Sequence, residues 1–475
     1  MCHRSPLPDI DLPGTTLFAS VFGPTVSAAL PDTPAMTEID TGRSVTYPQL
    51  RALALGTAAS LAARGVGPGS VVELRMPNSI HFAAGLLGAS ATGARVCVIG
   101  HSLIDDEANH LSALAHTTDR VAEEDIRPGE FEPVGNADDV AVIPFSSGTT
   151  GLPKGVELTH AAITANAAQF NAALAASGIG EGGGVVAPLP FSHIYGLNTL
   201  LMSSLTTRRH LLTAARFNLA EFTAAHRGRT IDISYIAPPL ALALSNHPTP
   251  EDFATTRFLV CGAASLDTNL ARKVERRIGV EILQGYGTTE SAPVTHVGIS
   301  GKSDPGTIGF AIPNTEFRLS EDNELLVRGP QLMRGYLDNE TATKRAIQDG
   351  WLHTGDIARI NDDETVTIID RAKDVFKYHG FQIAPAELEA LLLTHPDIDD
   401  VAVTGHRRTV DGVVEEVPRA FVVTQTALSE DAIMAWVAER VTPYKKVRMV
   451  TFVDAIPRSA AGKILRRELT SPGAE

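Results

Sequence analysis

Residues 146–155 bring together three glycines, four hydroxyl side chains and one lysine. Glycines let backbone N–H groups approach an anion closely, serines and threonines add further donors, and the lysine adds a cation. These groups are suited to holding a polyphosphate. The run does not end in the Gly-Lys-Ser/Thr of a Walker A loop, so it is not that motif. Taken alone, it is also typical of a flexible surface loop, and the rest of the chain must decide between the two interpretations.

The elements around this loop alternate between strands and helices. An apolar run over residues 140–145 predicts a buried strand that leads into the loop. Residues 70–76 and 94–99 predict two more strands, Ser79 is expected to cap a helix, and the Ala-rich residues 158–174 predict another helix. This alternation implies an α/β fold with a parallel, doubly wound sheet.

The loop sequence Ser146-Ser-Gly-Thr-Thr-Gly-Leu-Pro-Lys-Gly155 resembles the phosphate-loop signature of the adenylate-forming (ANL) enzymes. This superfamily includes acyl- and aryl-CoA ligases, luciferases and nonribosomal adenylation domains. The resemblance covers nearly the whole chain and is greatest to the 4-coumarate:CoA ligase branch. It implies the ANL fold, with a large layered α/β domain over residues 1–371 for ATP and the acid. A small, mobile α+β lid domain over residues 372–475 would carry the catalytic lysine.

The resemblance implies a nucleotide site assembled from several motifs of the large domain. In the family, the phosphate loop holds the β- and γ-phosphates, small residues line the adenosine, a tyrosine stacks on adenine, and an aspartate accepts both ribose hydroxyls. The matching residues are Ser146, Ser147, Gly148, Thr149, Thr150, Gly151 and Lys154 of the loop, Gly262, Ala263 and Ala264 of the wall, Gly285, Tyr286 and Gly287 at adenine, Asp356 at the ribose, and Arg371 at the ribose-phosphate. Packing alone also explains the small residues 262–264, and helix capping also explains an aspartate such as Asp356.

The predicted catalytic and metal-binding groups follow from the same resemblance. Thr289 and Glu290 match the pair that meets the α-phosphate and Mg²⁺, and Thr149 and Glu290 are the predicted metal ligands. Mg²⁺ suits such a site because it binds few protein carboxylates together with phosphate oxygens. Lys463, directly after a glycine, matches the catalytic lysine. A basic tail is otherwise a solvated run of charge.

A pocket for the acid is expected along residues 185–199 and just after Glu290. The predicted pocket residues are His193, Tyr195, Thr199, Pro293 and Val294. By the resemblance, His193 gates the carboxylate and is also a predicted catalytic residue, while Tyr195 faces the aromatic ring or its hydroxyl. Thr199 lies one helical turn further on the same face. A single histidine in such a run is most often structural, so its role rests on the resemblance.

The small domain is predicted to begin near Lys373, which occupies the hinge position of the family. Residues 375–383 predict a hairpin, residues 401–404 and 419–424 predict strands, and residues 429–441 predict a helix. In the family, the domain swings about the hinge after adenylation. The lysine then withdraws, and a face that here would include Lys377 and Gln382 enters for the acceptor step.

Two departures from the family bear on the acceptor. Relatives in this branch have a lysine where this chain has His379, so a titratable imidazole replaces a fixed cation. The connection over residues 100–139 is several tens of residues shorter than in relatives, which is expected to thin an outer layer. If CoA is the acceptor, Lys377, Arg407 or Arg408 would have to supply cations for its phosphates.

Composition restricts the cellular setting and the partners. The chain has 475 residues, a net charge of −15 and three scattered cysteines, without the spacing of a metal site or a disulfide framework. The negative charge argues against nucleic acid and anionic membrane surfaces as partners. Polar residues stand where a signal peptide would need an apolar core, and no apolar run is long enough to span a membrane. We expect a cytoplasmic protein that is a monomer or homodimer.

The sequence therefore predicts an adenylate-forming ligase that uses ATP, Mg²⁺ and CoA. It would activate an aromatic carboxylic acid of the cinnamate or benzoate type as an acyl-adenylate and transfer it to CoA. An alternative is a diazotase-like enzyme that couples nitrite to an aryl amine, such as an amino-substituted aromatic acid. A third possibility is a binding module without catalysis, against which Lys463, Asp356 and Glu290 argue.

Overall fold

The structure is a computed structural model that describes residues 2–23, 30–147, 153–246, 250–264, 266–372, 374, 376–378, 381–410, 413–458 and 464–470. The predicted residues Gly148, Thr149, Thr150, Gly151, Lys373, His379 and Lys463 lie outside them. Three further predicted residues lie in strands, and for these three the structure describes only the backbone: Ser147, Lys377 and Gln382. The chain divides into two compact units, one of Met1–Arg318 with Leu326–His353, and one of Leu319–Leu325 with Thr354–Glu475. The predicted domain boundary at residues 371 and 372 stays a prediction.

A nine-stranded sheet is the larger sheet of the first unit. In spatial order its strands are β16 (Phe310–Ala311), β15 (Val294–Val297), β14 (Glu281–Gly287), β13 (Phe258–Cys261), β12 (Ile231–Ile236), β10 (Gly184–Ala187), β11 (His210–Thr213), β2 (Pro34–Glu38) and β3 (Ser44–Thr46). The strands from β14 to β2 pair in parallel, with Val260 opposite Leu283 and Leu211 opposite Met36. Antiparallel strands close both edges.

A seven-stranded sheet carries the phosphate-loop segment. Its strands run in the order β19 (Gly335–Tyr336), β9 (Pro153–Thr159), β7 (Val140–Ile143), β5 (Arg95–Val98), β4 (Val71–Leu74) and β6 (Asp119–Arg120), and β8 (Phe145–Ser147) also pairs with β9. The strands from β7 to β6 are parallel, whereas β9 is antiparallel to its neighbours. The predicted parallel α/β architecture is therefore confirmed.

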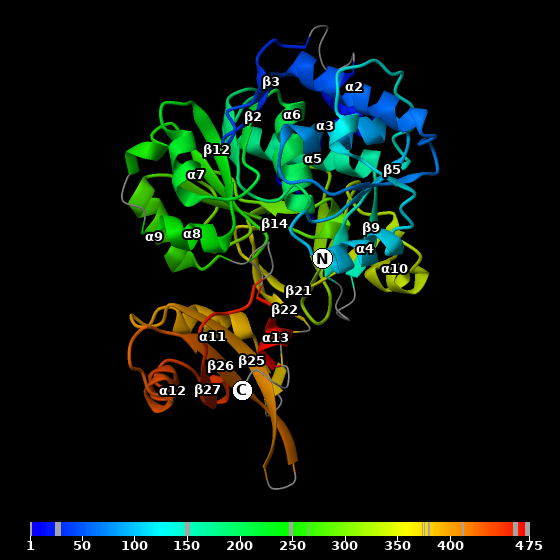
Figure 1. Ribbon diagram of the computed structural model, residues 1–475. Helices are drawn as coiled ribbons and strands as arrows, with labels where there is room; N and C mark the ends of the chain where they lie inside the picture. The colour runs from blue at the N-terminus through cyan, green and yellow to red at the C-terminus, as the bar shows by residue number, and fades with distance from the viewer. Residues whose placement is uncertain are drawn as a thin grey trace. The chain divides into compact units, whose positions relative to one another are not determined.

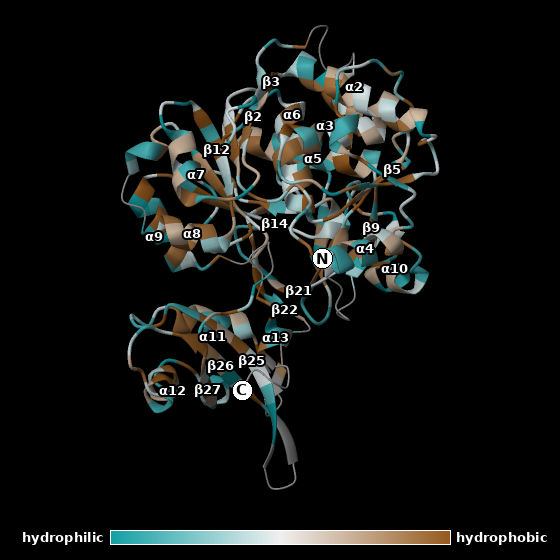
Figure 2. Ribbon diagram, viewed as in Figure 1, coloured by the Kyte–Doolittle hydropathy of each residue, from teal (hydrophilic) through white to brown (hydrophobic). Residues whose placement is uncertain are grey.

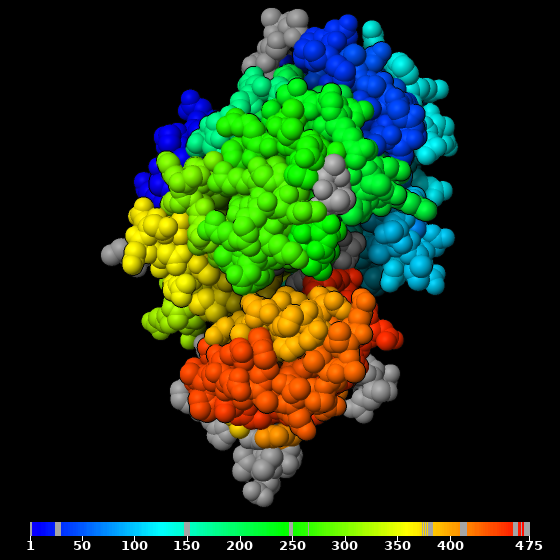
Figure 3. Space-filling view, turned by 90° about the vertical axis from the view of Figure 1, so that its left-hand side faces the viewer, coloured from blue at the N-terminus to red at the C-terminus, as the bar shows by residue number. Residues whose placement is uncertain are grey.

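Helices separate and cover these sheets (Figure 1). They are α1 (Leu17–Phe22), α2 (Tyr47–Ala63), α3 (Ile80–Ala91), α4 (Asp105–Leu114), α5 (His160–Ala176), α6 (Ser203–Thr206), α7 (Leu219–His226), α8 (Pro238–Leu244), α9 (Thr268–Ile278) and α10 (Glu340–Ala346). Helices α3 and α5 each contact strands of both sheets and form a shared central layer. Figure 2 shows brown apolar residues gathered on the inner strands and teal residues on the outer helices. In Figure 3, the part of the chain that contains α7, α8 and α9 is turned toward the viewer and is green.

The helix ends follow from local hydrogen bonding. The Thr46 side chain and Gln49 form a reciprocal capping box at the start of α2, and Ser79 accepts from the Phe82 N–H to cap α3, as predicted. The helix predicted from residue 158 begins at residue 160 instead. Strand β9 continues through residue 159, and the Thr159 side chain then caps α5 by accepting from the Ala162 N–H. Local sequence shows the helix but not the strand that precedes it.

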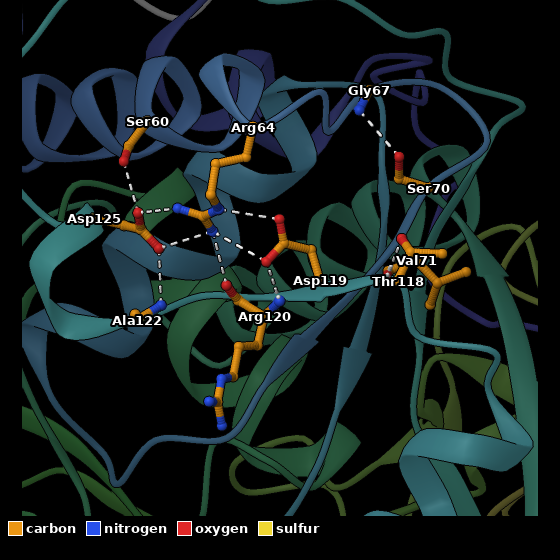
Figure 4. A network of polar contacts seen from close by, with 10 residues as sticks. All are labelled: Ser60, Arg64, Gly67, Ser70, Val71, Thr118, Asp119, Arg120, Ala122 and Asp125. Atoms are coloured by element: carbon orange, nitrogen blue, oxygen red, sulfur yellow. Dashed lines mark hydrogen bonds and ion pairs between the residues drawn. The ribbon is translucent and has the colours of Figure 1, made fainter.

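The short connection over residues 100–139 still contributes a helix, an edge strand and the carboxylates of a partly buried ion-pair network. The Arg64 guanidinium of α2 donates to Asp119 and to Asp125 (Figure 4). Asp125 also accepts from the Ser60 hydroxyl at 2.6 Å and from the Ala122 N–H at 2.9 Å. Burial alone would raise the pKa of Asp125, but these hydrogen bonds outweigh burial and lower it. The network ties the connection to α2.

Among the residues that the structure describes, the second unit contains a two-stranded sheet, a three-stranded sheet, part of a six-stranded sheet and three α-helices. Its elements are β22 (Val366–Arg371), which pairs with β21 (Trp351–Ile360), then β23 (Phe376–Tyr378), β24 (Phe381–Ile383), α11 (Pro385–Leu392), β25 (Asp400–Val410), β26 (Val413–Val423), α12 (Glu430–Ala438), β27 (Met449–Phe452) and α13 (Arg466–Thr470). Strands β25 and β26 are much longer than the predicted 401–404 and 419–424. Cross-strand pairing of polar residues, such as Arg407 with Glu416, extends the hairpin beyond its apolar part.

Candidate active site

The predicted phosphate loop is the tip of a β-hairpin. Strands β8 and β9 pair with Phe145 opposite Gly155 and Ser146 opposite Lys154, so that only residues 148–152 connect them. A Cβ atom at Gly155 would lie 3.1 Å from the Ile143 side chain, so the strand passes close to the sheet. This pairing fixes Ser146 and Lys154 side by side at the root of the loop.

Glu290 lies in a short 3-10 turn, η4 (Thr289–Ser291), directly after strand β14. Its half-buried carboxylate accepts from the Tyr336 hydroxyl through Oε1 at 2.8 Å. Its backbone carbonyl accepts from the Met333 N–H at 2.8 Å. Burial and then the neighbouring Glu290 raise the pKa of Tyr336, so the phenol keeps its proton.

The turn after η4 is held by buried amides. Asn166 of α5 donates to the Val294 carbonyl at 2.7 Å and accepts from the Val294 N–H at 3.1 Å. Asn198 donates to the Ala292 carbonyl at 2.5 Å. Gly287 has no room for a side chain, because a Cβ atom would lie 1.7 Å from the Pro293 carbonyl oxygen. The predicted residues Tyr286, Thr289, Glu290, Pro293 and Val294 thus belong to one tightly folded segment.

The predicted acid pocket begins with His193 and continues into a π-helix, Tyr195–Met202. The His193 Nδ1 atom accepts from the Tyr195 N–H at 3.3 Å, which leaves a proton on Nε2 of the neutral ring. Burial lowers the pKa of His193, so the ring is neutral at pH 7. Its Nε2–H is thus a donor suited to a carboxylate.

Tyr195 packs against Gly262, and Thr199 follows Tyr195 in the same π-helix. The Tyr195 hydroxyl donates to the Val260 carbonyl at 3.1 Å, which leaves only its lone pairs for another partner. A Cβ atom at Gly262 would lie 3.0 Å from the Tyr195 ring, so this glycine allows close packing on the ring. The Thr199 hydroxyl is buried and has no hydrogen-bond partner among the described residues. Ala263 has a positive φ of 71°, a strained conformation of the kind found beside functional sites.

The structure brings Asp356 and Arg371 together in the second unit. They lie opposite each other on β21 and β22, and the Arg371 Nε atom is 2.8 Å from Asp356 Oδ1. Asp356 lies within a strand, so the helix-capping alternative is wrong. Gly355, at φ 73°, donates its N–H to Glu324 and shapes the bend before Asp356.

The segment around Lys463 is bracketed by described residues. Arg458 and Ile464 form an antiparallel bridge, and the Leu465 N–H donates to the Pro457 carbonyl at 2.8 Å. Arg466 then donates to both carboxylate oxygens of Glu389, at 2.7 and 2.8 Å. The described residues on the two sides of the segment 459–463, Arg458 and Ile464, therefore lie next to each other.

The face proposed for the acceptor step is formed by two hairpins. Lys377 lies opposite Gln382 on the short β23–β24 hairpin, which confirms the hairpin predicted over residues 375–383. Arg407 lies opposite Glu416 on the β25–β26 hairpin, and Arg408 lies opposite residue 415.

The donor set near Glu290 fits a magnesium ion bound with a nucleotide. Tyr336 occupies only Oε1 of Glu290, and no hydrogen bond or ion pair of the described residues involves Oε2. Within the described ranges, no three His, Cys, Asp or Glu side chains are grouped as a metal cage. One available carboxylate oxygen without a cage is suited to Mg²⁺ that takes its remaining ligands from phosphate and water.

Sequence reasoning did not identify Tyr336 or Arg466. Tyr336 lies in a two-residue strand, and its contact with Glu290 depends on the antiparallel pairing of β19 with β9. Arg466 was part of a basic tail, and nothing in the tail indicates that its partner is Glu389. For Tyr336, the only local signal is a tyrosine after a glycine, which is weak.

Comparisons with known proteins show the family to which the chain belongs. A model of the AMP-binding enzyme family matches residues 25–118 and 112–337, and a model of the AMP-binding enzyme C-terminal domain matches residues 387–463. A 4-coumarate–CoA ligase from Oryza sativa subsp. japonica is 34% identical over 542 aligned residues, with 98% of this chain and 94% of the relative covered. The 4-coumarate–CoA ligase of Pinus taeda is 34% identical, with 99% and 97% covered.

A solved benzoate CoA ligase from Burkholderia xenovorans LB400 has the same fold. It superposes with a TM-score of 0.85 at 24% identity, covering 96% of this chain and 100% of that one. Fold and relatives together define an adenylate-forming ligase. The chain belongs to the AMP-binding enzyme family. Among its described helices, none is long and apolar enough to cross a membrane.

Proposed function

We propose that this protein activates an aromatic carboxylic acid of the cinnamate or benzoate type with ATP and transfers the acyl group to CoA. The observation that carries the proposal is the pocket region around Tyr195. The Tyr195 ring packs against Gly262, and the buried Thr199 hydroxyl of the same π-helix has no hydrogen-bond partner among the described residues. The 4-coumarate– and benzoate–CoA ligases among the relatives support the same substrate class.

The proposed first step joins a carboxylate oxygen to the α-phosphorus of ATP and releases pyrophosphate. Both reactants are anions, so catalysis depends on positioning and on charge compensation. The neutral His193 donates from Nε2 to the carboxylate, Lys154 and the loop hold the β- and γ-phosphates, and Lys463 compensates the charge that develops. Mg²⁺ on Glu290 and Thr149 would supply further compensation at the phosphates. Asp356 accepts from the ribose hydroxyls while Arg371, already beside it, keeps its carboxylate oriented.

The proposed second step transfers the acyl group from AMP to the thiol of CoA, with the AMP phosphate as leaving group. Lys377 and Gln382, opposite each other on β23 and β24, are the proposed contacts of this step after rotation about Lys373. We place the enzyme in the cytoplasm, because its buried cysteines Cys97 and Cys261 are free thiols, as expected in a reducing compartment. We further propose that it is a monomer or homodimer.

A diazotase-like reaction with nitrite is a second candidate because the predicted acceptor face lacks one fixed cation of the branch. His379 replaces the lysine of the branch, and Arg407 faces Glu416 across the hairpin. A small acceptor or a small activated anion needs no such cations. The wild-type enzyme should therefore be offered ATP, Mg²⁺ and a panel of aromatic and amino-aromatic acids, with CoA, nitrite or neither, and the products identified by mass spectrometry. A thioester establishes the first candidate, and a nitrite-dependent product establishes the second.

The His379→Lys variant separates the two candidates further. With CoA as acceptor, imidazole helps only while protonated, so CoA-dependent turnover should fall as the pH rises past about 6.5. Replacement by lysine should then lower the KM for CoA at alkaline pH and flatten this fall. Equal pH profiles for both enzymes, together with no thioester, contradict the use of CoA.

A further inference from the structure

Tyr336 lies between two residues of opposite charge that the proposed function assigns to the nucleotide. Its hydroxyl donates to Oε1 of Glu290 at 2.8 Å. The Nζ atom of Lys154 lies 4.7 Å from the centre of the Tyr336 ring, within the range of a cation–π interaction. One side chain therefore contacts the proposed metal carboxylate with its tip and the proposed phosphate cation with its face.

The backbone around Tyr336 is fastened to the elements that carry both charged residues. Tyr336 pairs with Val156 on β9, the strand of Lys154, and the Leu337 N–H donates to the Gly155 carbonyl at 2.9 Å. The Met333 N–H donates to the carbonyl of Glu290 itself. The Tyr336 N–H donates to the Thr343 hydroxyl at 2.8 Å, which ties the strand to α10. The position of the ring is thus determined from three sides.

An ammonium and a carboxylate that both contact one residue would attract each other strongly if they closed to ion-pair distance. At an effective dielectric constant near 20, two unit charges 4 Å apart interact by about 4 kcal/mol. Yet no ion pair joins Lys154 to Glu290 among the described residues, whose ion pairs lie elsewhere. The phenol gives Glu290 a neutral donor and the ring gives Lys154 a neutral partner. Neither contact cancels the charge that a ligand needs.

We propose that Tyr336 is a positioning residue that keeps the Lys154 ammonium and the Glu290 carboxylate apart, so that one remains available to phosphate and the other to a divalent cation. The inference rests on the proposed function, because it takes the nucleotide roles of both residues from it. Tyr336 itself need not contact substrate. Its effect is on the metal dependence of nucleotide binding.

The first test measures the binding of ATP to purified wild-type and variant protein by calorimetry, with and without Mg²⁺. The second test titrates Mn²⁺ and follows its binding by its electron paramagnetic resonance signal. Tyr336→Phe keeps the ring beside Lys154 and loses only the donor to Glu290. We expect the half-saturating Mn²⁺ concentration to rise about 5- to 10-fold in the presence of ATP, in line with the loss of a hydrogen bond to a charged group. Metal-free binding of ATP should stay within about twofold of the wild type, because Lys154 keeps its partner.

Tyr336→Leu removes the ring as well. Lys154 and Glu290 can then pair directly, so metal-free binding of ATP should also weaken, by about tenfold. Tyr47→Phe is the matched control, because it removes one buried hydroxyl that donates to the Arg209 carbonyl at 2.8 Å in the same unit, away from this cluster. The control should leave both binding curves unchanged.

Three results would overturn the inference, and they are distinguishable from failure of the proposed function. If Tyr336→Phe binds Mn²⁺ as the wild type does, the hydroxyl has no positioning role. If it weakens ATP equally with and without metal, its role is general and structural. If Tyr336→Phe still weakens Mn²⁺ binding in a Glu290→Gln background, it does not act through Glu290. A wild-type protein that binds no ATP under any condition would instead refute the proposed function.

Discussion

Two clusters of charged residues, one in each unit, use opposite arrangements. In the first unit, Lys154 and Glu290 each contact Tyr336 and do not pair with one another. In the second unit, Arg466 donates directly to both oxygens of Glu389, and the Val403 N–H donates to the same carboxylate at 2.7 Å. The first arrangement leaves charge for a ligand, and the second uses all of its charge within the fold.

The two carboxylates also differ in burial, and the paired one is buried more deeply. Glu290 is half-buried, whereas Glu389 is only 9% exposed. Burial raises the pKa of Glu389 to about 7, and the positive charge of Arg466 acts against this rise. Such a carboxylate is tolerated because it is paired, and breaking the pair leaves a group that is costly to keep ionised. We therefore expect substitutions in the first cluster to affect ligands and those in the second to affect stability.

The largest effect is expected from Lys463→Ala, which changes a residue of the second unit that is assigned to the ligand and not to the fold. Pyrophosphate release from ATP with an aromatic acid should fall by about 10²–10³-fold, since one preorganised charge at the reacting phosphate is lost. The melting temperature and the affinity for ATP should change little. Near wild-type pyrophosphate release would contradict the assignment of Lys463.

Arg466→Ala, three residues further along, should instead destabilise the second unit. We expect a loss of about 3 kcal/mol, the lower end of the range for breaking a buried pair, because Glu389 can take up a proton. Urea unfolding in a Trp351→Phe background would report this through Trp436, the other tryptophan of the chain. An Arg466→Met and Glu389→Leu double variant should recover part of the loss. If Lys463→Ala lost stability and Arg466→Ala kept the stability of the wild type, the roles assigned to these two residues would be the wrong way round.

Thr199→Val tests whether the unpartnered hydroxyl in the first unit also serves a ligand. The substitution keeps the shape of the side chain, and we expect kcat/KM to fall about tenfold for hydroxyl- or amino-substituted aromatic acids. Unsubstituted cinnamate or benzoate should be affected less than threefold. Competition assays between paired acids measure this ratio. Equal losses for both kinds of acid, or a preference for long-chain fatty acids, would refute the pocket.

The smallest effect concerns a fully paired network within the first unit, that of Arg64 with Asp119 and Asp125. Both carboxyl groups have lowered pKa values, so their contribution to stability is present above about pH 4 and is lost as the pH falls through the lowered values. Arg64→Gln should lower stability by about 1 kcal/mol at pH 7. The difference from the wild type should shrink as the pH approaches 3. A difference in melting temperature that is constant with pH would show that the pairs contribute nothing.

The sequence predicted the elements whose signals are local. Ser79 indicated the start of α3, and the apolar run before Ser146 indicated β7, because capping and periodicity need only neighbouring residues. Asp356 and Arg371 were predicted separately from the family motifs, and the structure shows that they form a pair. Their roles, like those of the other site residues, stay predictions.

What the sequence did not predict depends on pairing between distant segments. The length of β25 and β26 follows from each being the partner of the other, so neither strand shows it alone. The contact between Tyr336 and Glu290 requires β19 to lie beside β9 with Gly335 opposite Glu157. A shift of that register by one residue would turn Tyr336 to the other face of the sheet. No pattern within residues 330–340 contains this information.

The pairing of Met36 with Leu211 has a consequence for biosynthesis. Strand β2 leaves the ribosome well before its partner β11, which is made after the whole phosphate-loop hairpin. At about 5–20 residues per second, the apolar strand waits about 10–35 s for its place in the sheet. During that time its backbone edge is open to other nascent chains, which is the condition under which strands aggregate. Production of this protein should therefore depend on chaperones that bind the first fifty residues, whereas its mature activity should not.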